Sequence, residues 1–177
     1  MDIKTMNIRT ILLAEDDPED VEITLAALQE HNLANKVLVV NNGEEALDYL
    51  YCRGKFNMRA GGNPILVLLD NKMPKVSGLD VLKAIKSDEQ LKTIPVVVLT
   101  SSRETPDLVE FYKCGVNAYV VKPVDFGEFA KAVKQLGVFW AAVNEPTPVL
   151  AQSGEVISPG KKEVKNEMSA PHPAPGG

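Results

Sequence analysis

The strongest indication of the fold is the stretch ILVLLDNKMP, residues Ile65–Pro74. Its run of apolar residues follows Pro64, and such a run is typical of a strand buried on both faces of a parallel sheet. Asp70 comes directly after the run, at the carboxyl end of the expected strand. Because open α/β sheets bind ligands at the carboxyl ends of their strands, Asp70 is placed for chemistry; the alternative is a plain turn residue.

Four further apolar runs alternate along the chain with segments of helical periodicity. The other strands are expected at Thr10–Ala14, Lys36–Val40, Pro95–Thr100 and Ala118–Val121. The helices are expected at Pro18–His31, Glu44–Tyr51, Leu79–Ser87, Thr105–Cys114 and Phe126–Val143. This alternation predicts an α/β fold, a flavodoxin-like (βα)5 three-layer sandwich whose parallel sheet has the strand order 2-1-3-4-5.

The first helix carries recognisable start signals. Asp17 is expected to cap it and Pro18 to occupy its first position. Glu19 and Asp20 fall in the first turn, and we interpret both as acids that complement the helix dipole. The expected buried stripe consists of Val21, Leu25 and Leu28.

Composition excludes several classes of protein. The net charge of −5 over 177 residues argues against a DNA-binding module, which needs a basic surface. Cys52 and Cys114 stand apart, without the spacing of a zinc site or a disulfide framework. Residues 1–10 lack the apolar segment of a secretion signal, and no run has the length of a membrane helix. We therefore expect a cytoplasmic protein that binds neither DNA nor a membrane.

The composition changes near Asn144. Six of the twelve prolines lie between Asn144 and Gly177, a part of the chain without aromatic residues. We therefore expect one folded domain over residues 1–143 and a proline-rich, disordered tail over residues 144–177.

Polar residues end the expected strands. Glu15 and Asp16 follow the first strand, Asp70 the third, Thr100 ends the fourth and Lys122 follows the fifth. In the order 2-1-3-4-5 the three carboxylates converge, and each like-charged pair at about 4 Å costs roughly 4 kcal/mol at an effective dielectric of 20. Mg²⁺ relieves this repulsion, and a lysine and a hydroxyl stabilise a transferring phosphoryl group. The set predicts a carboxylate that is reversibly phosphorylated.

The same residues resemble a known family. Glu15-Asp16, Asp70 with Met73-Pro74 and Gly78, Thr100-Ser101 and Lys122-Pro123 resemble the receiver domain of two-component response regulators. The resemblance covers roughly residues 8–143. The segments EEALDYL and IPVVVLTSS and the pair Phe139-Trp140 are most similar to stand-alone regulators that partner bacterial phytochrome-type histidine kinases.

The resemblance implies a phosphoryl acceptor and a metal site. Asp70 would accept a phosphoryl group from a histidine of a sensor kinase. Glu15, Asp16 and Asp70 would hold Mg²⁺, together with the backbone carbonyl of Lys72. The chain would assist its own phosphorylation and dephosphorylation without turning over a separate substrate, and so would not be an enzyme in the usual sense.

It also implies a switch. Thr100 and Lys122 would contact the phosphoryl group, and Tyr119 would move inward as Thr100 is drawn to it; the alternative for Tyr119 is an ordinary aromatic side chain. The bond between Lys122 and Pro123 resembles the cis peptide of the family.

Three questions stay open at this stage. The output is either a changed surface that a downstream protein recognises or onward transfer to a histidine phosphotransfer protein, because no effector domain is expected after Val143. Phe139 and Trp140 are candidates for a homodimer contact, or they pack on their own domain. The alternatives in function are a phosphorylation-independent adaptor and an aspartyl-phosphate phosphohydrolase, which Lys72 disfavours because that class carries an acid there.

Overall fold

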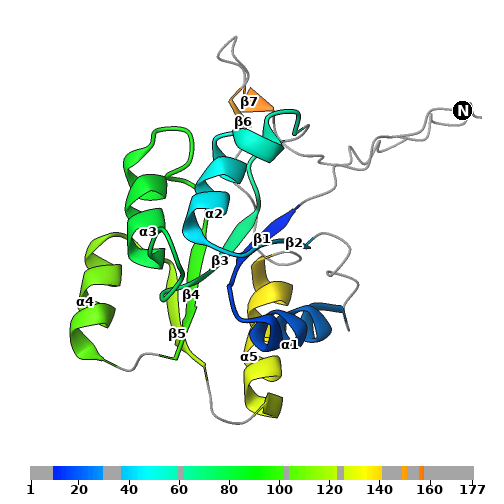
Figure 1. Ribbon diagram of the computed structural model, residues 1–177. Coiled ribbons are helices and arrows are strands. Elements are labelled where there is room, and N and C mark those ends of the chain that lie inside the picture. The colour runs from blue at the N-terminus through cyan, green and yellow to red at the C-terminus, as the bar shows by residue number, and fades with distance from the viewer. Residues whose placement is uncertain are drawn as a thin grey trace, which may run out of the picture. The chain divides into compact units, whose positions relative to one another are not determined.

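The computed structural model describes residues 10–29, 37–59, 62–101, 104–122, 126–140, 149–150 and 156–157. Within them a five-stranded parallel sheet has the order β2-β1-β3-β4-β5 (Figure 1). Its strands are β1 (Ile11–Ala14), β2 (Val37–Val40), β3 (Leu66–Asp70), β4 (Val96–Thr100) and β5 (Ala118–Val121). The predicted strand order is confirmed.

Helices cover both faces of this sheet. They are α1 (Pro18–Gln29), α2 (Gly43–Leu50), α3 (Gly78–Ser87), α4 (Thr105–Lys113) and α5 (Phe126–Val138), with a short 3₁₀ turn, η2 (Gly54–Phe56). Figure 1 shows α1 and α5 side by side on one face and α2 and α3 on the other. Phe111 of α4 packs with the residues of α2 and α3. The described helices therefore form the two outer layers of the predicted sandwich.

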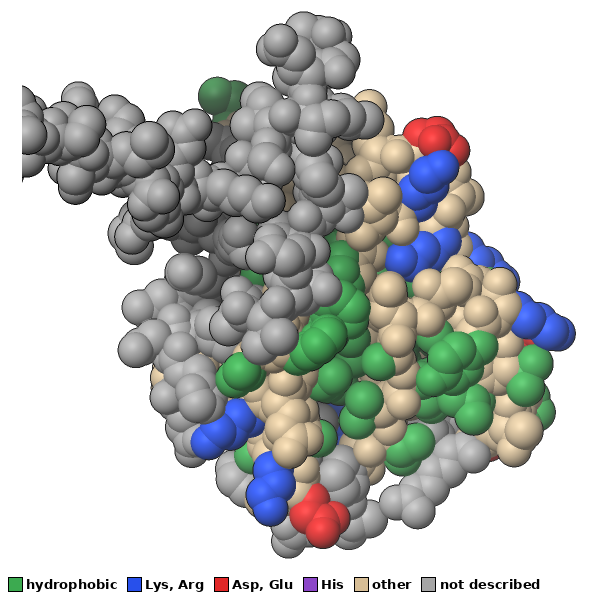
Figure 2. Space-filling model, turned by 180° about the vertical axis from the view of Figure 1, so that it is seen from behind, with side chains coloured by type: hydrophobic (Ala, Val, Ile, Leu, Met, Phe, Trp, Pro, Cys, Tyr) green, Lys and Arg blue, Asp and Glu red, His purple; other side chains and the backbone are tan. Residues whose placement is uncertain are grey.

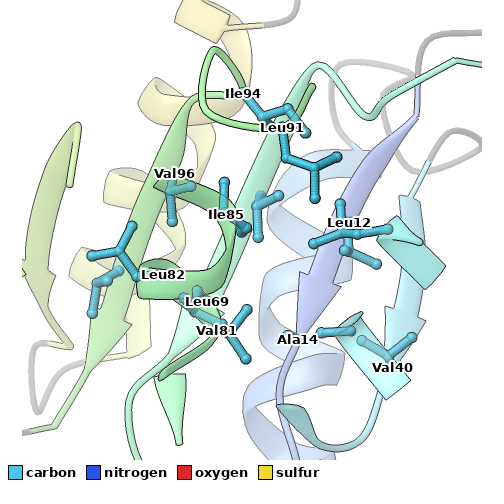
Figure 3. Packing of buried hydrophobic residues seen from close by; sticks show 14 of the residues in the cluster. Leu12, Ala14, Val40, Leu69, Val81, Leu82, Ile85, Leu91, Ile94 and Val96 are labelled. Atoms are coloured by element: carbon cyan, nitrogen blue, oxygen red, sulfur yellow. The ribbon is translucent and has the colours of Figure 1, made fainter. Parts of the chain in front are cut away.

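The core has two parts, one on each face of the sheet. Along β1, Leu12 and Ala14 pack toward α2 and α3, whereas Ile11 and Leu13 pack toward α1 and α5. Figure 3 shows the first part, in which the side chains of α3 lie over the strands. Every residue of β1, β3 and β4 is buried. Burial on both faces explains why these strands read as continuous apolar runs in the sequence.

The start of α1 is as predicted, but its buried face is not. Asp17 Oδ1 accepts hydrogen bonds from the amides of Glu19 (2.8 Å) and Asp20 (3.4 Å), so Asp17 is the cap. The buried residues of the helix are Thr24, Ala27 and Leu28. Of the predicted stripe, Leu28 is buried as expected, whereas Val21 and Leu25 are only partly buried and the smaller Thr24 and Ala27 are buried instead.

The ends of two helices differ from the expected bounds. The helix α1 ends at Gln29, and His31 lies outside the described residues. The helix α5 ends at Val138, and Phe139 and Trp140 continue it as a wider, π-helical turn.

At the amino ends of β4 and β5 a lysine ties three segments together. Lys86 Nζ, at the end of α3, donates hydrogen bonds to the carbonyls of Ile94 (2.8 Å) and Lys92 (3.2 Å) and to Asn117 Oδ1 (3.2 Å). Asn117 Oδ1 also accepts from the amide of Val96 (2.8 Å). Burial lowers the pKa of Lys86. These bonds join α3, the connection before β4 and the residue before β5.

The chain divides into two compact units, Met1–Glu145 and Pro146–Gly177. In the second unit β6 (Val149–Leu150) pairs antiparallel with β7 (Val156–Ile157), and its other residues lie outside the described part. The disorder of the tail stays a prediction. Among the described helices, none has the length and apolar character needed to cross a membrane.

Candidate functional site

Polar side chains lie at the carboxyl ends of four adjacent strands. Glu15 follows β1, Asp70 and Thr100 are the last residues of β3 and β4, and Lys122 follows β5. Carboxylate oxygens of Glu15, Asp16 and Asp70 lie within 4.8 Å of one another. The structure therefore brings together the residues that the sequence placed at the strand ends, Asp16 being exposed and the other two acids buried.

Asp70 is held by the loop that follows it. Its Oδ2 accepts a hydrogen bond of 2.6 Å from the amide of Lys72, and the amide of Gly78 donates to the carbonyl of Asn71 (3.0 Å). A Cβ on Gly78 would lie 2.2 Å from the carbonyl oxygen of Asp70, so only glycine permits this close approach. Asn71 Nδ2 donates to Asp107 Oδ2 (3.4 Å) and links this loop to the first turn of α4.

Lys122 lies at the centre of a charged pocket that it forms with Glu15, Asp20 and Asp70. Its amide donates to the carbonyl of Thr100 (2.7 Å), which extends the pairing of β4 with β5 by one bond. Its ammonium lies 2.7 Å from Glu15 Oε2, 2.6 Å from Asp20 Oδ2 and 3.1 Å from Asp70 Oδ1. The side chain is 10% exposed, so these ion pairs are largely shielded from water.

Burial and neighbouring charges shift the ionisation of two groups in the pocket. Burial raises the pKa of Glu15 from 4.5 to about 7, with a contribution from the charge of Asp70; hydrogen bonding and attraction to Lys122 oppose this shift only in part. Burial alone would lower the pKa of Lys122, but its hydrogen bonds to Asp20 and Glu15 outweigh burial and raise it. The pocket therefore holds a firmly charged ammonium and more carboxylate charge than this ammonium neutralises.

Asp20 is the residue of the pocket that the sequence analysis missed. Its interpretation as an acid that only complements the helix dipole was wrong, because its carboxylate binds Lys122 across 102 residues of sequence. A signal was present: Asp20 precedes the buried residues Thr24, Ala27 and Leu28 by four, seven and eight positions. An acid on the helix face that meets the domain needs a partner. Glu19, by contrast, is exposed.

The two predicted switch residues lie on neighbouring strands. Thr100 is fully buried at the end of β4. Tyr119 of β5 pairs in register with Val98 and is partly buried, and its ring centroid lies 5.4 Å from that of Phe111 in α4, with the planes tilted by 57°. Pro123, and with it the expected cis peptide, lies outside the described residues. The switch remains a prediction.

The aromatic pair after α5 has one inward and one outward member. The rings of Phe139 and Trp140 meet edge to face, with centroids 5.1 Å apart. Trp140 packs against the core between the sheet, α1 and α5, while Phe139 is 48% exposed.

Comparisons with family models and with solved structures indicate the same family. Residues 11–134 match the response regulator receiver domain. The structure of the bacteriophytochrome response regulator AtBRR is 58% identical and covers 77% of this chain and 98% of its own, with a TM-score of 0.63. The crystal structure of the phosphorylated cyanobacterial phytochrome response regulator RcpA is 35% identical, covers 77% and 96%, and has a TM-score of 0.72.

A third similar protein was crystallised with a metal ion. The response regulator Rcp1 of Synechocystis sp. (strain ATCC 27184 / PCC 6803 / Kazusa) is 33% identical over 132 residues, which are 75% of this chain and 88% of Rcp1. The crystal structure of its Mn²⁺-bound form covers 78% of this chain and 99% of that chain, at 31% identity and a TM-score of 0.73. This chain therefore belongs to the family of response regulator receiver domains.

Proposed function

We propose that this chain accepts a phosphoryl group on Asp70 from a phosphorylated histidine of a sensor kinase. The observation that carries the proposal is the position of the Lys122 ammonium, 3.1 Å from Asp70 Oδ1 in a pocket of buried carboxylates. An ammonium at this distance is placed to neutralise charge on a group attached to the Asp70 carboxylate.

A divalent cation fits the same pocket. The oxygens of Glu15, Asp16 and Asp70 are hard ligands within 4.8 Å of one another, and a cation there would offset their mutual repulsion. We assign the Mg²⁺ site to these carboxylates and to the backbone carbonyl of Lys72. Bound Mg²⁺ would supply positive charge to the phosphoryl oxygens.

The residues of the pocket have distinct roles in the transfer. A carboxylate oxygen of Asp70 attacks phosphorus, forming a P–O bond while the P–N bond to the kinase histidine breaks and the imidazole leaves. Lys122 donates to a phosphoryl oxygen, and the Thr100 hydroxyl donates to another. Tyr119 then turns inward as the end of β4 shifts. The chain assists its own phosphorylation and dephosphorylation and turns over no separate substrate.

The similarity to the phytochrome response regulator RcpA and the bacteriophytochrome response regulator AtBRR supports a phytochrome-type histidine kinase as the partner. The output is a changed surface read by a downstream protein or onward transfer to a histidine phosphotransfer protein. Figure 2 shows hydrophobic side chains near the middle of one face of the molecule. The exposed large hydrophobic side chains among the described residues are Met58, Leu108, Val109, Tyr112 and Phe139.

Phosphorylation by a small donor tests the proposal. We expect acetyl phosphate with Mg²⁺ to label the protein, and Asp70→Asn to abolish the label, because an amide is not a nucleophile toward phosphorus. Asp48→Asn is the matched control, since Asp48 lies on α2 and pairs with Arg53 outside the pocket. Intact-protein mass spectrometry reads the added phosphoryl group. A parent protein that takes no label from acetyl phosphate or any kinase would instead support an adaptor of receiver fold.

A further inference from the structure

The phosphoryl transfer proposed above gives no role to the ion pair between Lys122 and Asp20. The ammonium of Lys122 binds carboxylates from three separate segments: Glu15 after β1, Asp20 in α1 and Asp70 at the end of β3. Its distance to Asp20 (2.6 Å) is as short as that to Glu15 (2.7 Å) and shorter than that to Asp70 (3.1 Å). Asp20 is thus a full partner of the lysine.

Asp20 differs from the other two partners in its relation to the metal site. Glu15 and Asp70 belong, with Asp16, to the group of carboxylates whose oxygens could share one cation. Asp20 does not belong to that group. A divalent cation that binds Glu15 and Asp70 repels the ammonium from them, because both are positively charged. Asp20 is then the carboxylate that remains for Lys122.

The first turn of α1 fixes the position of Asp20 beside Lys122. It is in the first turn of α1, where its amide bonds Asp17, and it lies on the helix face that is buried at Thr24, Ala27 and Leu28. Its ion pair with Lys122 lies outside the group of carboxylates that could share a cation, so a cation bound to that group leaves this pair in place.

Resting on the proposed function, we propose that Asp20 is a positioning residue that retains Lys122 at the pocket when a divalent cation takes over Glu15 and Asp70. Without Asp20, the carboxylates that pair with the ammonium among the described residues are the two acids that the cation needs. It then competes with the cation as an internal positive charge.

Titration of the full chain with Mg²⁺ by calorimetry tests this role. We expect Asp20→Asn to raise the Kd for Mg²⁺ by about fivefold, the effect of one partly buried, charge-assisted hydrogen bond. Asp20→Glu should keep the Kd within about twofold of the parent, since a carboxylate on the same turn still reaches the ammonium. Glu19→Gln is the matched control for the loss of one charge in the same helical turn, and should also stay within about twofold.

A double-mutant cycle separates positioning from simple charge. In a Lys122→Met background, Asp20→Asn should change the Kd no more than Glu19→Gln does, because the ammonium that Asp20 retains is gone. An equal effect of Asp20→Asn in both backgrounds would show that Asp20 acts on the metal directly and would overturn the inference. Circular dichroism confirms that each variant is folded, and Asp20→Ser replaces Asp20→Asn if the latter is not.

The two proposals fail in different ways. If the parent binds Mg²⁺ and is phosphorylated on Asp70, but the Kd of Asp20→Asn equals that of the parent, only the role of Asp20 is wrong. If the parent binds no Mg²⁺ at all, both proposals are wrong.

Discussion

At the scale of single residues, burial strongly shifts the ionisation of Glu15. Its pKa is raised from 4.5 to about 7 in the folded protein, so between these values the folded state binds more protons than the unfolded state. The contribution of this group to the free energy of unfolding therefore falls as the pH rises through this window, and above it the charged, buried carboxylate is destabilising.

Replacing this acid should remove that pH dependence. Without Mg²⁺, we expect Glu15→Gln to gain stability relative to the parent as the pH rises from about 5 to about 8, by at most about 3 kcal/mol. Urea unfolding in a chelating buffer measures this difference in the free energy of unfolding. Glu19→Gln, at an exposed site, should follow the parent at every pH. Parallel stability curves for Glu15→Gln and the parent would show that Glu15 has no raised pKa.

Most residues of the pocket could be predicted from the sequence, but Asp20 could not. Glu15, Asp70, Thr100 and Lys122 were predictable because each ends an apolar run, and the strand order alone then brings them to one edge of the sheet. Asp20 was not, because the helix dipole offered a complete local explanation of an acid in a first turn. Its partner is distant in sequence, and a local pattern says nothing about distant charges.

At the scale of elements, the loop between β3 and α3 depends on one glycine. A Cβ on Gly78 would lie 2.2 Å from the Asp70 carbonyl oxygen and 2.9 Å from Asn71 Cα, both of which are backbone atoms. We expect Gly78→Ala to destabilise the protein by about 2 kcal/mol or more and to weaken Mg²⁺ binding, since the loop that carries Lys72 must shift. Gly62→Ala, with nothing within 4 Å, is the control. Thermal unfolding compares the two, and equal melting temperatures would contradict the expectation.

The helices were less predictable than the strands. The buried face of α1 was displaced from the predicted one because Thr24 and Ala27 are inward, and an apolar stripe is a poor guide where small residues make the closest packing. The strands were clear because burial on both faces leaves little room for polar residues.

At the scale of the whole molecule, Phe139 provides the test of a homodimer. It is 48% exposed, whereas Trp140 packs on its own domain, so Phe139 is the better candidate for a contact with a second copy. We expect Phe139→Asp to shift a dimeric parent to monomer in analytical ultracentrifugation, because a charge in an apolar contact is costly. Met58→Asp, on the connection after α2, is the control and should leave the mass unchanged. A parent that sediments as a monomer would exclude this homodimer.

The bonds of Lys86 have a consequence for where the domain deforms. They fasten the amino ends of β4 and β5 to α3, at the end of the strands opposite to Asp70 and Lys122. At the other end, the amide of Lys122 donates to the carbonyl of Thr100, and the Lys122 ammonium pairs with Glu15, Asp20 and Asp70. We therefore expect a change at Asp70 to move the carboxyl ends of β4 and β5 more than their amino ends, which Lys86 holds.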